Sequence, residues 1–171
     1  LDLSVIDEMP PGRKTIATFW RRENRRKKIY SFLKEKLDEG RQAYIVCPLI
    51  EASEEMPQLT SAEELYEDLN EGFLADYELA LLHSGIKAEE KKETMMSFRS
   101  GKIDLIVATT VIEVGVDVSN ASIMIIENAE RFGLAQLHQL RGRVGRGKDQ
   151  SYCILISNPP GEEAEKRLEI M

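Results

Sequence analysis

The chain has 171 residues, enough to bury most of its apolar surface around one core, so a single domain is the default expectation. With 31% charged residues, a formal net charge of -7 and no run of about eighteen apolar residues, the sequence excludes a membrane-spanning helix. The first residues, LDLSVIDEMP, also lack the basic and apolar regions of a signal peptide. The composition therefore predicts a soluble, intracellular protein.

The chain starts with an extended stretch over 1–14 that contains Pro10, Pro11 and Gly12, which predicts an entry linker ahead of a domain over 15–171. Beyond the linker, short β-rich runs alternate with polar segments of helical period. This alternation predicts crossover units and a parallel sheet. We expect strands over 15–20, 43–50, 77–84, 103–110, 121–128 and 151–157, and helices over 21–40, 59–72, 88–101, 133–140 and 162–171.

Two of the expected strands, IDLIVA and SIMIIE, are apolar on both faces, as strands must be when helices cover each side of a sheet. The predicted fold is a three-layer α/β/α sandwich with a mainly parallel sheet. Gly40, Gly72 and Gly101 each close a helical segment, where a left-handed residue commonly ends a helix.

Charge is unevenly distributed along the chain. Residues 11–36 carry ten Lys or Arg against Glu23 and Glu35, whereas residues 51–78 carry ten acids and no base. A basic stretch such as RRENRRKK is typical of a solvated helix face and also of a nucleic-acid footprint, and both interpretations stay open. The acidic segment is expected to face water and to avoid phosphate.

The two cysteines, Cys47 and Cys153, lie inside apolar strand-like runs. A small buried side chain is the usual role of cysteine in such a run, and metal ligands would be more closely spaced. We therefore expect two core thiols and no metal site. The acidic pair Asp7-Glu8 precedes two prolines and belongs to the predicted linker, so it is not expected to hold a metal either.

The segment QLHQLRGRVGRG, over 136–147, places Arg141, Arg143 and Arg146 within six positions. On a helix-like segment, a spacing of three would direct Arg143 and Arg146 to one side, toward a common anion. The planar guanidinium fork suits phosphate. The alternative is a basic loop that pairs with surface acids, and spacing alone does not decide between the two.

The sequence lacks the phosphate-binding loop G-x-x-x-x-G-K-[ST]. Its two Gly-Lys pairs, Gly101-Lys102 and Gly147-Lys148, are followed by Ile and Asp. The chain is therefore not expected to hold a triphosphate by itself.

Three motifs in order resemble those of superfamily 2 helicases. Gln139, Gly142, Arg143 and Arg146 match Q-x-x-G-R-x-x-R of motif VI, ATTVIEVGVDV resembles motif V, and YIVCPLI followed by LLHSG resembles the motif IV region. The stretches IDEMPPGRK and IENAERFGLAQLHQLRGRVGRG are similar to the RecG-type branch of the superfamily. The resemblance covers nearly the whole chain.

This resemblance implies the second of two RecA-like motor domains, with a P-loop NTPase-like fold that has no P-loop of its own. ATP and Mg²⁺ would then be bound mainly by a first motor domain, and this chain alone would be inactive. The family pattern assigns Arg143 and Arg146 as arginine fingers and Gln139 as a residue that orients groups at the γ-phosphate.

Other residues carry over by position, each with a structural alternative. Asp117 would accept a hydrogen bond from the ATP ribose, although a loop Asp is commonly a turn or cap residue. His83 would lie near DNA phosphates, or would be a strand-end histidine that the backbone satisfies. The full expected set is Asp117, Gly115 and Gly142 for ATP, and Thr109, His83, Gly85 and Arg141 for DNA, with Arg141 also open to a structural role.

The implied function is that of an ATP-dependent DNA helicase that remodels stalled replication forks and branched DNA by branch migration, in recombination and repair. We expect a monomer in the bacterial cytoplasm, associated with the nucleoid, with forked DNA and the first RecA-like domain of the same chain as partners and no membrane contact. Two alternatives remain. Transcription-repair coupling translocases share FGLAQLHQLRGRVGR, although ENAERF and VCPLIEASEE favour the RecG type. A non-catalytic α/β module that binds phosphate or nucleic acid is the alternative of another class.

Overall fold

The computed structural model describes residues 15–49, 61–109, 118–159 and 161–171. The predicted linker over 1–14 and the two motif V residues Gly115 and Asp117 lie outside this part of the chain. No helix within the described ranges is long and apolar enough to cross a membrane.

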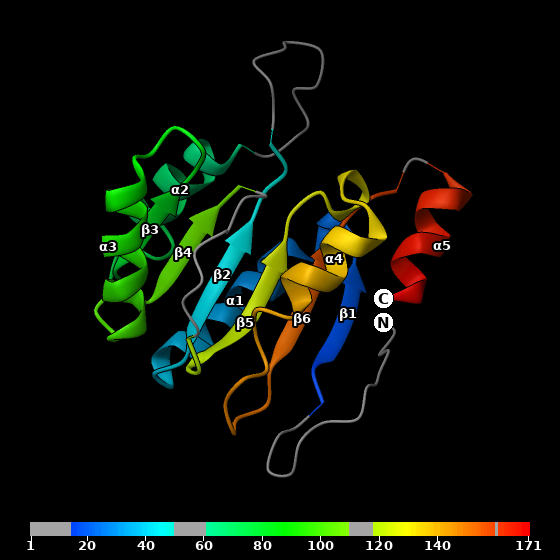
Figure 1. Cartoon of the computed structure of the whole chain (residues 1–171). Coiled ribbons are helices and arrows are strands. Elements are labelled where there is room, and N and C mark those ends of the chain that lie inside the picture. Colours follow the sequence, from blue (N-terminus) through cyan, green and yellow to red (C-terminus); the bar gives the residue numbers. More distant parts are fainter. Residues whose placement is uncertain (1–14, 50–60, 110–117, 160) are drawn as a thin grey trace.

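The described strands form one twisted sheet in which every paired strand is parallel to its neighbour (Figure 1). Their order across the sheet is β1-β6-β5-β2-β4-β3, so all carboxyl ends lie at one edge. The strands are β1 (Ala17–Arg21), β2 (Gln42–Val46), β3 (Leu79–Leu82), β4 (Leu105–Ala108), β5 (Ala121–Ile126) and β6 (Tyr152–Ile156).

Helices cover both faces of the sheet and complete three layers (Figure 1). The first two helices pack on one face, and the last three pack on the other. The α/β/α sandwich predicted from the sequence is confirmed. The helices are α1 (Arg26–Asp38), α2 (Ala62–Glu71), α3 (Ala88–Arg99), α4 (Leu134–Arg141) and α5 (Glu162–Ile170), with short 3-10 turns η1 (Glu23–Arg25) and η2 (Ala129–Arg131).

The continuous apolar strands are explained by this layering. In β4, Ile106 and Ala108 belong to the core under α3 and α4, whereas Leu105 and Val107 belong to the core under α1 and α2. All four residues of the strand are fully buried. Since successive side chains of a strand point to opposite faces, a strand between two helical layers needs apolar residues at every position.

The helix ends confirm two of the three glycine predictions. Gly40 and Gly101 adopt the left-handed conformation, with φ of 88° and 87°. Gly72 does close α2, but the left-handed conformation expected for it is wrong, because its φ is −121°. The chain leaves α2 through a wider turn in which the Leu74 N–H donates to the Leu69 carbonyl at 2.9 Å, and this turn carries the Leu74 side chain into the core.

Both cysteines are buried and unpaired with each other, so the prediction of core thiols is confirmed. Burial raises the pKa of Cys153 to about 12. Burial, and after it the nearby Glu127 carboxylate, raises the pKa of Cys47. Since the thiolate is the reactive form, neither side chain is suited to nucleophilic chemistry.

Candidate functional site

The segment that carries the predicted arginines follows α4 on the face shared by α3 and α5. Helix α4 ends at Arg141, and the chain continues in a turn in which the Arg143 N–H donates to the Leu140 carbonyl at 3.0 Å. At Gly145 the backbone takes a left-handed φ of 87° and reverses direction. Helix α4 ends before Arg143 and Arg146, so the helical spacing expected from the sequence does not apply to them, and their approach to a common anion stays a prediction.

Close backbone contacts fix the path of this segment. A Cβ atom at Gly145 would lie 2.8 Å from the Ile16 side chain, just ahead of β1. A Cβ atom at Gly147 would lie 2.4 Å from the Ser119 carbonyl oxygen, just ahead of β5. At Gly147 the close atom belongs to the backbone, and at Gly145 the left-handed φ favours glycine, so both residues let the arginine segment lie against the body of the domain.

The three arginines differ in their surroundings. The Arg141 guanidinium donates to the Met171 carbonyl at 2.8 Å and to the Thr18 hydroxyl at 3.4 Å, and its other nitrogen lies 3.0 Å from the His138 Nδ1 atom. Arg141 therefore joins α4 to β1 and to the end of α5, which agrees with its structural alternative. Arg143 is half-buried and Arg146 is exposed.

The remaining motif VI residues lie beside these arginines. Gln139 is exposed on α4, and Gly142 caps the helix with an ordinary right-handed φ of −68°. The four residues that the sequence predicts for the nucleotide site here follow one another along the end of α4 and the turn after it: Gln139, Gly142, Arg143 and Arg146.

A second polar region lies at the carboxyl ends of β2, β3 and β4. A cavity of about 210 Å³ opens there beside the first turn of α2. It brings together His83 and Thr109, which are 26 positions apart in the sequence and were both predicted to face DNA. The other lining residues are Pro48, Leu49, Ser61, Ala62, Glu63 and Ser84.

His83 is oriented by its neighbours. The Gly85 N–H donates to His83 Nδ1 at 3.0 Å, so the neutral ring carries its hydrogen on Nε2, which lies 3.8 Å from a Glu63 carboxylate oxygen. A Cβ atom at Gly85 would lie 2.9 Å from the imidazole ring. Gly85 thus acts by permitting this close turn, and His83 presents a donor toward the cavity mouth.

Thr109 has an unusual environment. Its Oγ1 atom is buried and has no hydrogen-bond partner among the described residues, although its backbone N–H donates to the Leu82 carbonyl at 3.2 Å. A buried hydroxyl without a partner costs about 1–3 kcal/mol. Because this hydroxyl borders the cavity, a bound ligand could supply the missing partner.

A charged network at the end of β5 was not predicted. Glu127 is fully buried, and the Arg26 guanidinium contacts its two carboxylate oxygens at 2.5 and 3.2 Å. The Tyr30 hydroxyl donates to the same carboxylate at 2.8 Å. The hydrogen bond to Glu127 raises the pKa of Arg26, and burial followed by the nearby carboxylate raises the pKa of Tyr30.

This network fixes the entry into the α4 segment. The next residue, Asn128, adopts a left-handed φ of 49°, which asparagine tolerates better than most residues, and turns the chain into η2. Glu130 in η2 then accepts hydrogen bonds from Ser157 at its carboxylate and from Arg167 of α5 at its carbonyl. A sequence signal existed, because Arg26 and Tyr30 are four apart on one helix and Glu127 follows an otherwise apolar strand.

Within the described ranges, no group of three or more His, Cys, Asp or Glu side chains is arranged to hold a metal ion. The segment after α4 carries arginine side chains beside the Gln139 amide, which suit phosphate oxygens. The polar groups of the cavity are the hydroxyls of Ser61, Ser84 and Thr109 and the side chains of His83 and Glu63. Residues Gly115 and Asp117, expected at the nucleotide, lie outside the described part of the chain.

The domain is thus an α/β/α sandwich that carries an arginine segment between β5 and β6. The chain belongs to the family of helicase conserved C-terminal domains, whose model matches residues 24–148. Proteins called ATP-dependent DNA helicase RecG are similar to it along its whole length. The protein from Bacillus subtilis (strain 168) is 47% identical over 171 residues, and that from Thermotoga maritima is 50% identical over 168 residues.

These similarities confirm the resemblance to RecG-type helicases and the RecA-like fold. A solved structure of RecG bound to a three-way DNA junction matches 96% of this chain with a TM-score of 0.79 and 47% identity. The two sequence matches include 100% and 98% of this chain. The chain spans only 25% and 21% of the length of those two relatives, and 21% of the chain in the RecG structure. The relatives therefore contain much that lies beyond the region compared.

Proposed function

We propose that this chain is the second motor domain of an ATP-dependent DNA helicase that remodels stalled replication forks and other branched DNA. One observation carries the proposal: the fold holds two separate polar regions. The arginine segment lies on the half of the sheet that contains β1 and β6, and the Thr109 cavity lies at the ends of β2, β3 and β4. A motor needs both a nucleotide site and a nucleic-acid site, and these two regions have the chemistry for each.

At the nucleotide site, Arg143 and Arg146 would stabilise the charge that develops on the transferred phosphoryl group. Gln139 would orient groups beside them, and Gly115, Asp117 and Gly142 would complete the surface toward ATP. The bound nucleotide and Mg²⁺ would be held mainly by the first motor domain of the same chain. This chain's own part is to present guanidinium groups on a backbone that Gly145 and Gly147 hold in place.

At the DNA site, the Thr109 hydroxyl and the His83 ring would contact backbone phosphates. Such contacts position a protein on DNA without reading its sequence, as a translocating motor requires. Glu63 is the acid in the cavity lining; its side chain is 67% exposed and would have to move away from a phosphate. The RecG structure solved with a three-way junction supports branched DNA as the ligand.

In this proposal the full-length protein works as a monomer in the bacterial cytoplasm, on forked DNA at the nucleoid. The test is ATP turnover by the full-length protein with and without a three-way junction. We expect stimulation by the junction that falls steeply with salt, because phosphate contacts release counterions, and that hardly changes with base sequence. A strong preference for one sequence at equal shape and salt would count against a translocase. The 171-residue chain alone should not turn over ATP.

A further inference from the structure

The buried carboxylate after β5 is held from two sides. Glu127 is fully buried, and its backbone N–H donates to the Val46 carbonyl of β2 at 2.8 Å. Its carboxylate accepts hydrogen bonds from Arg26 at 2.5 and 3.2 Å and from Tyr30 at 2.8 Å. The backbone of this residue is therefore fixed by a central strand of the sheet, and its side chain is fixed by two side chains of α1.

A short hydrogen-bonded turn connects Glu127 to α4. In this turn the Arg131 N–H donates to the Asn128 carbonyl at 2.9 Å, and the Phe132 N–H donates to the Ala129 carbonyl at 3.1 Å. The side chains of Ala129 and Phe132 are buried in the same core cluster as the inner face of α4. Because close-packed cores transmit displacements, a shift of Glu127 would reach the start of α4.

Stability alone does not explain a charged network at this place. A buried ion pair can commonly be replaced by apolar side chains of similar volume without loss of stability, because removing charges from water offsets their attraction. Arg26 also lies with Lys27 and Lys28 in the first turn of α1, where the helix dipole disfavours cations. Hydrogen bonds have fixed directions, so the network is suited to specifying one position of the Glu127 carboxylate.

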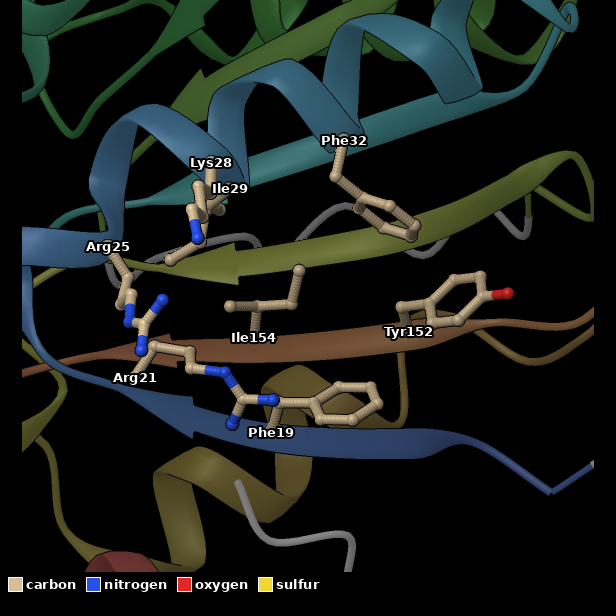
Figure 2. Close-up of a pocket in the computed structure, with 8 residues that line it drawn as sticks. All are labelled: Phe19, Arg21, Arg25, Lys28, Ile29, Phe32, Tyr152 and Ile154. Carbon is tan, nitrogen blue, oxygen red and sulfur yellow. The ribbon is translucent and has the colours of Figure 1, made fainter.

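The neighbouring cations of α1 extend elsewhere. Arg25 and Lys28 line a groove beside β1 and β6, and Figure 2 shows both side chains extending from α1 toward these strands. Lys27 lines a hollow between α1 and α2. Of these four cations, all within the described ranges, Arg26 is the one that contacts Glu127. The start of α1 therefore offers matched positions for control variants.

We propose that Arg26, Tyr30 and Glu127 are positioning residues for ATP hydrolysis, because they hold the start of α4 and, through it, the segment that carries Arg143 and Arg146. This positioning role rests on the proposed function, in which these two arginines reach the nucleotide. A displacement of about 1 Å can cost about two decades in rate, even when the changed residue is far from the chemistry. Since the first motor domain would hold most of the nucleotide, the loss should appear in kcat and hardly in KM for ATP.

Junction-stimulated ATP turnover of the full-length protein tests this role. Glu127→Gln keeps the shape of the side chain but removes its charge, and it should lower kcat about tenfold or more while KM for ATP changes less than about threefold. Tyr30→Phe removes one hydrogen bond and should lower kcat about threefold. Arg26→Lys should recover part of the kcat that Arg26→Ala loses, because lysine restores the charge without the planar fork.

Two controls separate positioning from a loss of charge or of stability. Arg25→Ala removes a cation one residue away and should keep kcat within about twofold. Gln42→Leu breaks a buried network at the amino end of β2, where the side chain donates to the carbonyls of Phe98 and Ile103 at 2.5 and 2.7 Å. It should lower the melting temperature but keep kcat within about twofold at a temperature where all variants are folded. Unchanged kcat in Glu127→Gln, or an equal loss in Gln42→Leu, would overturn the proposal.

Hydrogen exchange of the full-length protein without nucleotide gives a readout that does not depend on turnover. In Glu127→Gln, amides over 129–144 should exchange at least about tenfold faster, while those of α3 exchange as in the wild type. Gln42→Leu should leave exchange over 129–144 unchanged. Unaltered exchange there in Glu127→Gln would overturn the proposal.

Two outcomes separate the positioning role from the proposed function. If Arg143→Ala lowers kcat and Glu127→Gln does not, the positioning role is wrong and the proposed motor function stands. If the wild-type protein shows no junction-stimulated ATP turnover, the proposed function is wrong, and the positioning role is wrong with it.

Discussion

Two buried polar side chains follow the strands that flank β2, and they differ in their hydrogen-bond partners. Glu127, after β5, is fully buried and receives hydrogen bonds from both Arg26 and Tyr30. Thr109, after β4, is also buried, yet its hydroxyl has no partner in the described structure. A polar group that the chain itself satisfies holds the fold together, whereas one left unsatisfied beside a cavity points to a ligand.

The arginine segment contains residues to which two different roles are assigned. Arg141 is used within the domain, because its guanidinium joins Met171, Thr18 and His138. The family pattern assigns Arg143 and Arg146 to the nucleotide instead. Variants whose effects on stability and on ATP turnover are measured separately test this difference between Arg141 and the other two arginines.

The largest effect is expected at the proposed fingers. In the full-length protein, Arg143→Ala or Arg146→Ala should lower kcat for DNA-stimulated ATP hydrolysis by about three to five decades, because the contact forms mainly in the reacting state. Nucleotide affinity should change much less, and lysine at either position should rescue poorly, since it lacks the planar fork.

Arg141→Ala is the matched control. It should lower the melting temperature, because it removes contacts among α4, β1 and α5, and it should lower kcat far less than the other two variants. Near-wild-type turnover in both Arg143→Ala and Arg146→Ala, with the fold intact, would remove the proposed nucleotide site.

The next effect concerns the network at β5. Glu127→Ala should lower the free energy of unfolding of the chain by about 3 kcal/mol in urea titrations, because it leaves the Tyr30 hydroxyl buried without a partner. This loss of free energy lies near the lower end of the range for breaking a buried ion pair, because 33% of the Arg26 side chain is exposed and can be hydrated again. Asp149→Ala, which breaks the exposed Arg41–Asp149 pair, should cost at most about 1 kcal/mol. Equal losses in the two variants would contradict a structural role for the network.

Alkaline pH should lower the free energy of unfolding of the domain. The folded-state pKa values of Cys47 and Tyr30 are raised, and that of Cys153 is about 12 against a usual value of 9.0. A raised pKa contributes stability that is complete below the unfolded-state value and is lost as pH rises through the folded-state value. Each cysteine should therefore lower the free energy of unfolding by about 1.4 kcal/mol per pH unit above roughly pH 9, and Tyr30 should do the same above roughly pH 10.

Urea titrations at pH 8, 9 and 10 measure this slope. The slope should be smaller in the Cys47→Ala, Cys153→Ala variant, because alanine does not titrate. A stability that is constant from pH 8 to pH 10 would show that these groups reach solvent in the native state.

The smallest effect is expected at Thr109. Thr109→Val removes a buried hydroxyl without a partner, so the free energy of unfolding should stay the same or rise by about 1 kcal/mol. Junction affinity of the full-length protein should fall about tenfold, as expected for the loss of one hydrogen bond to a charged phosphate. A loss of stability without a loss of affinity would place Thr109 with Glu127 rather than with the ligand.

Local sequence patterns predicted the sheet well because its strands have a strong signal. A strand such as β4 must be apolar at every position when helices cover both sides, and its residues show this directly. The left-handed conformation predicted for Gly72 is wrong because burial of the Leu74 side chain in the core determines the turn after α2. Such a tertiary contact cannot be seen in the local sequence. The helical spacing of the arginines failed because α4 stops at Arg141.

The candidate site was predictable only where a motif names its residues. His83 and Thr109 were expected from family motifs, and the parallel sheet then brings them to one cavity. The Glu127 network was missed because its partners lie 97 and 101 positions away, and one sequence does not reveal which distant charges meet.

The pairing of β1 with β6 also has a consequence for how the domain reaches its native state. Within the described sheet, the first strand hydrogen-bonds only to the last, and the Trp20 indole donates to Ser157, 137 residues further along the chain. During synthesis β1 must therefore wait on the ribosome until nearly the whole domain has emerged, and closing so long a loop makes this a late and slow event. Because Trp20 is the sole tryptophan, its fluorescence in refolding experiments should report that last closure separately from the collapse of the central strands.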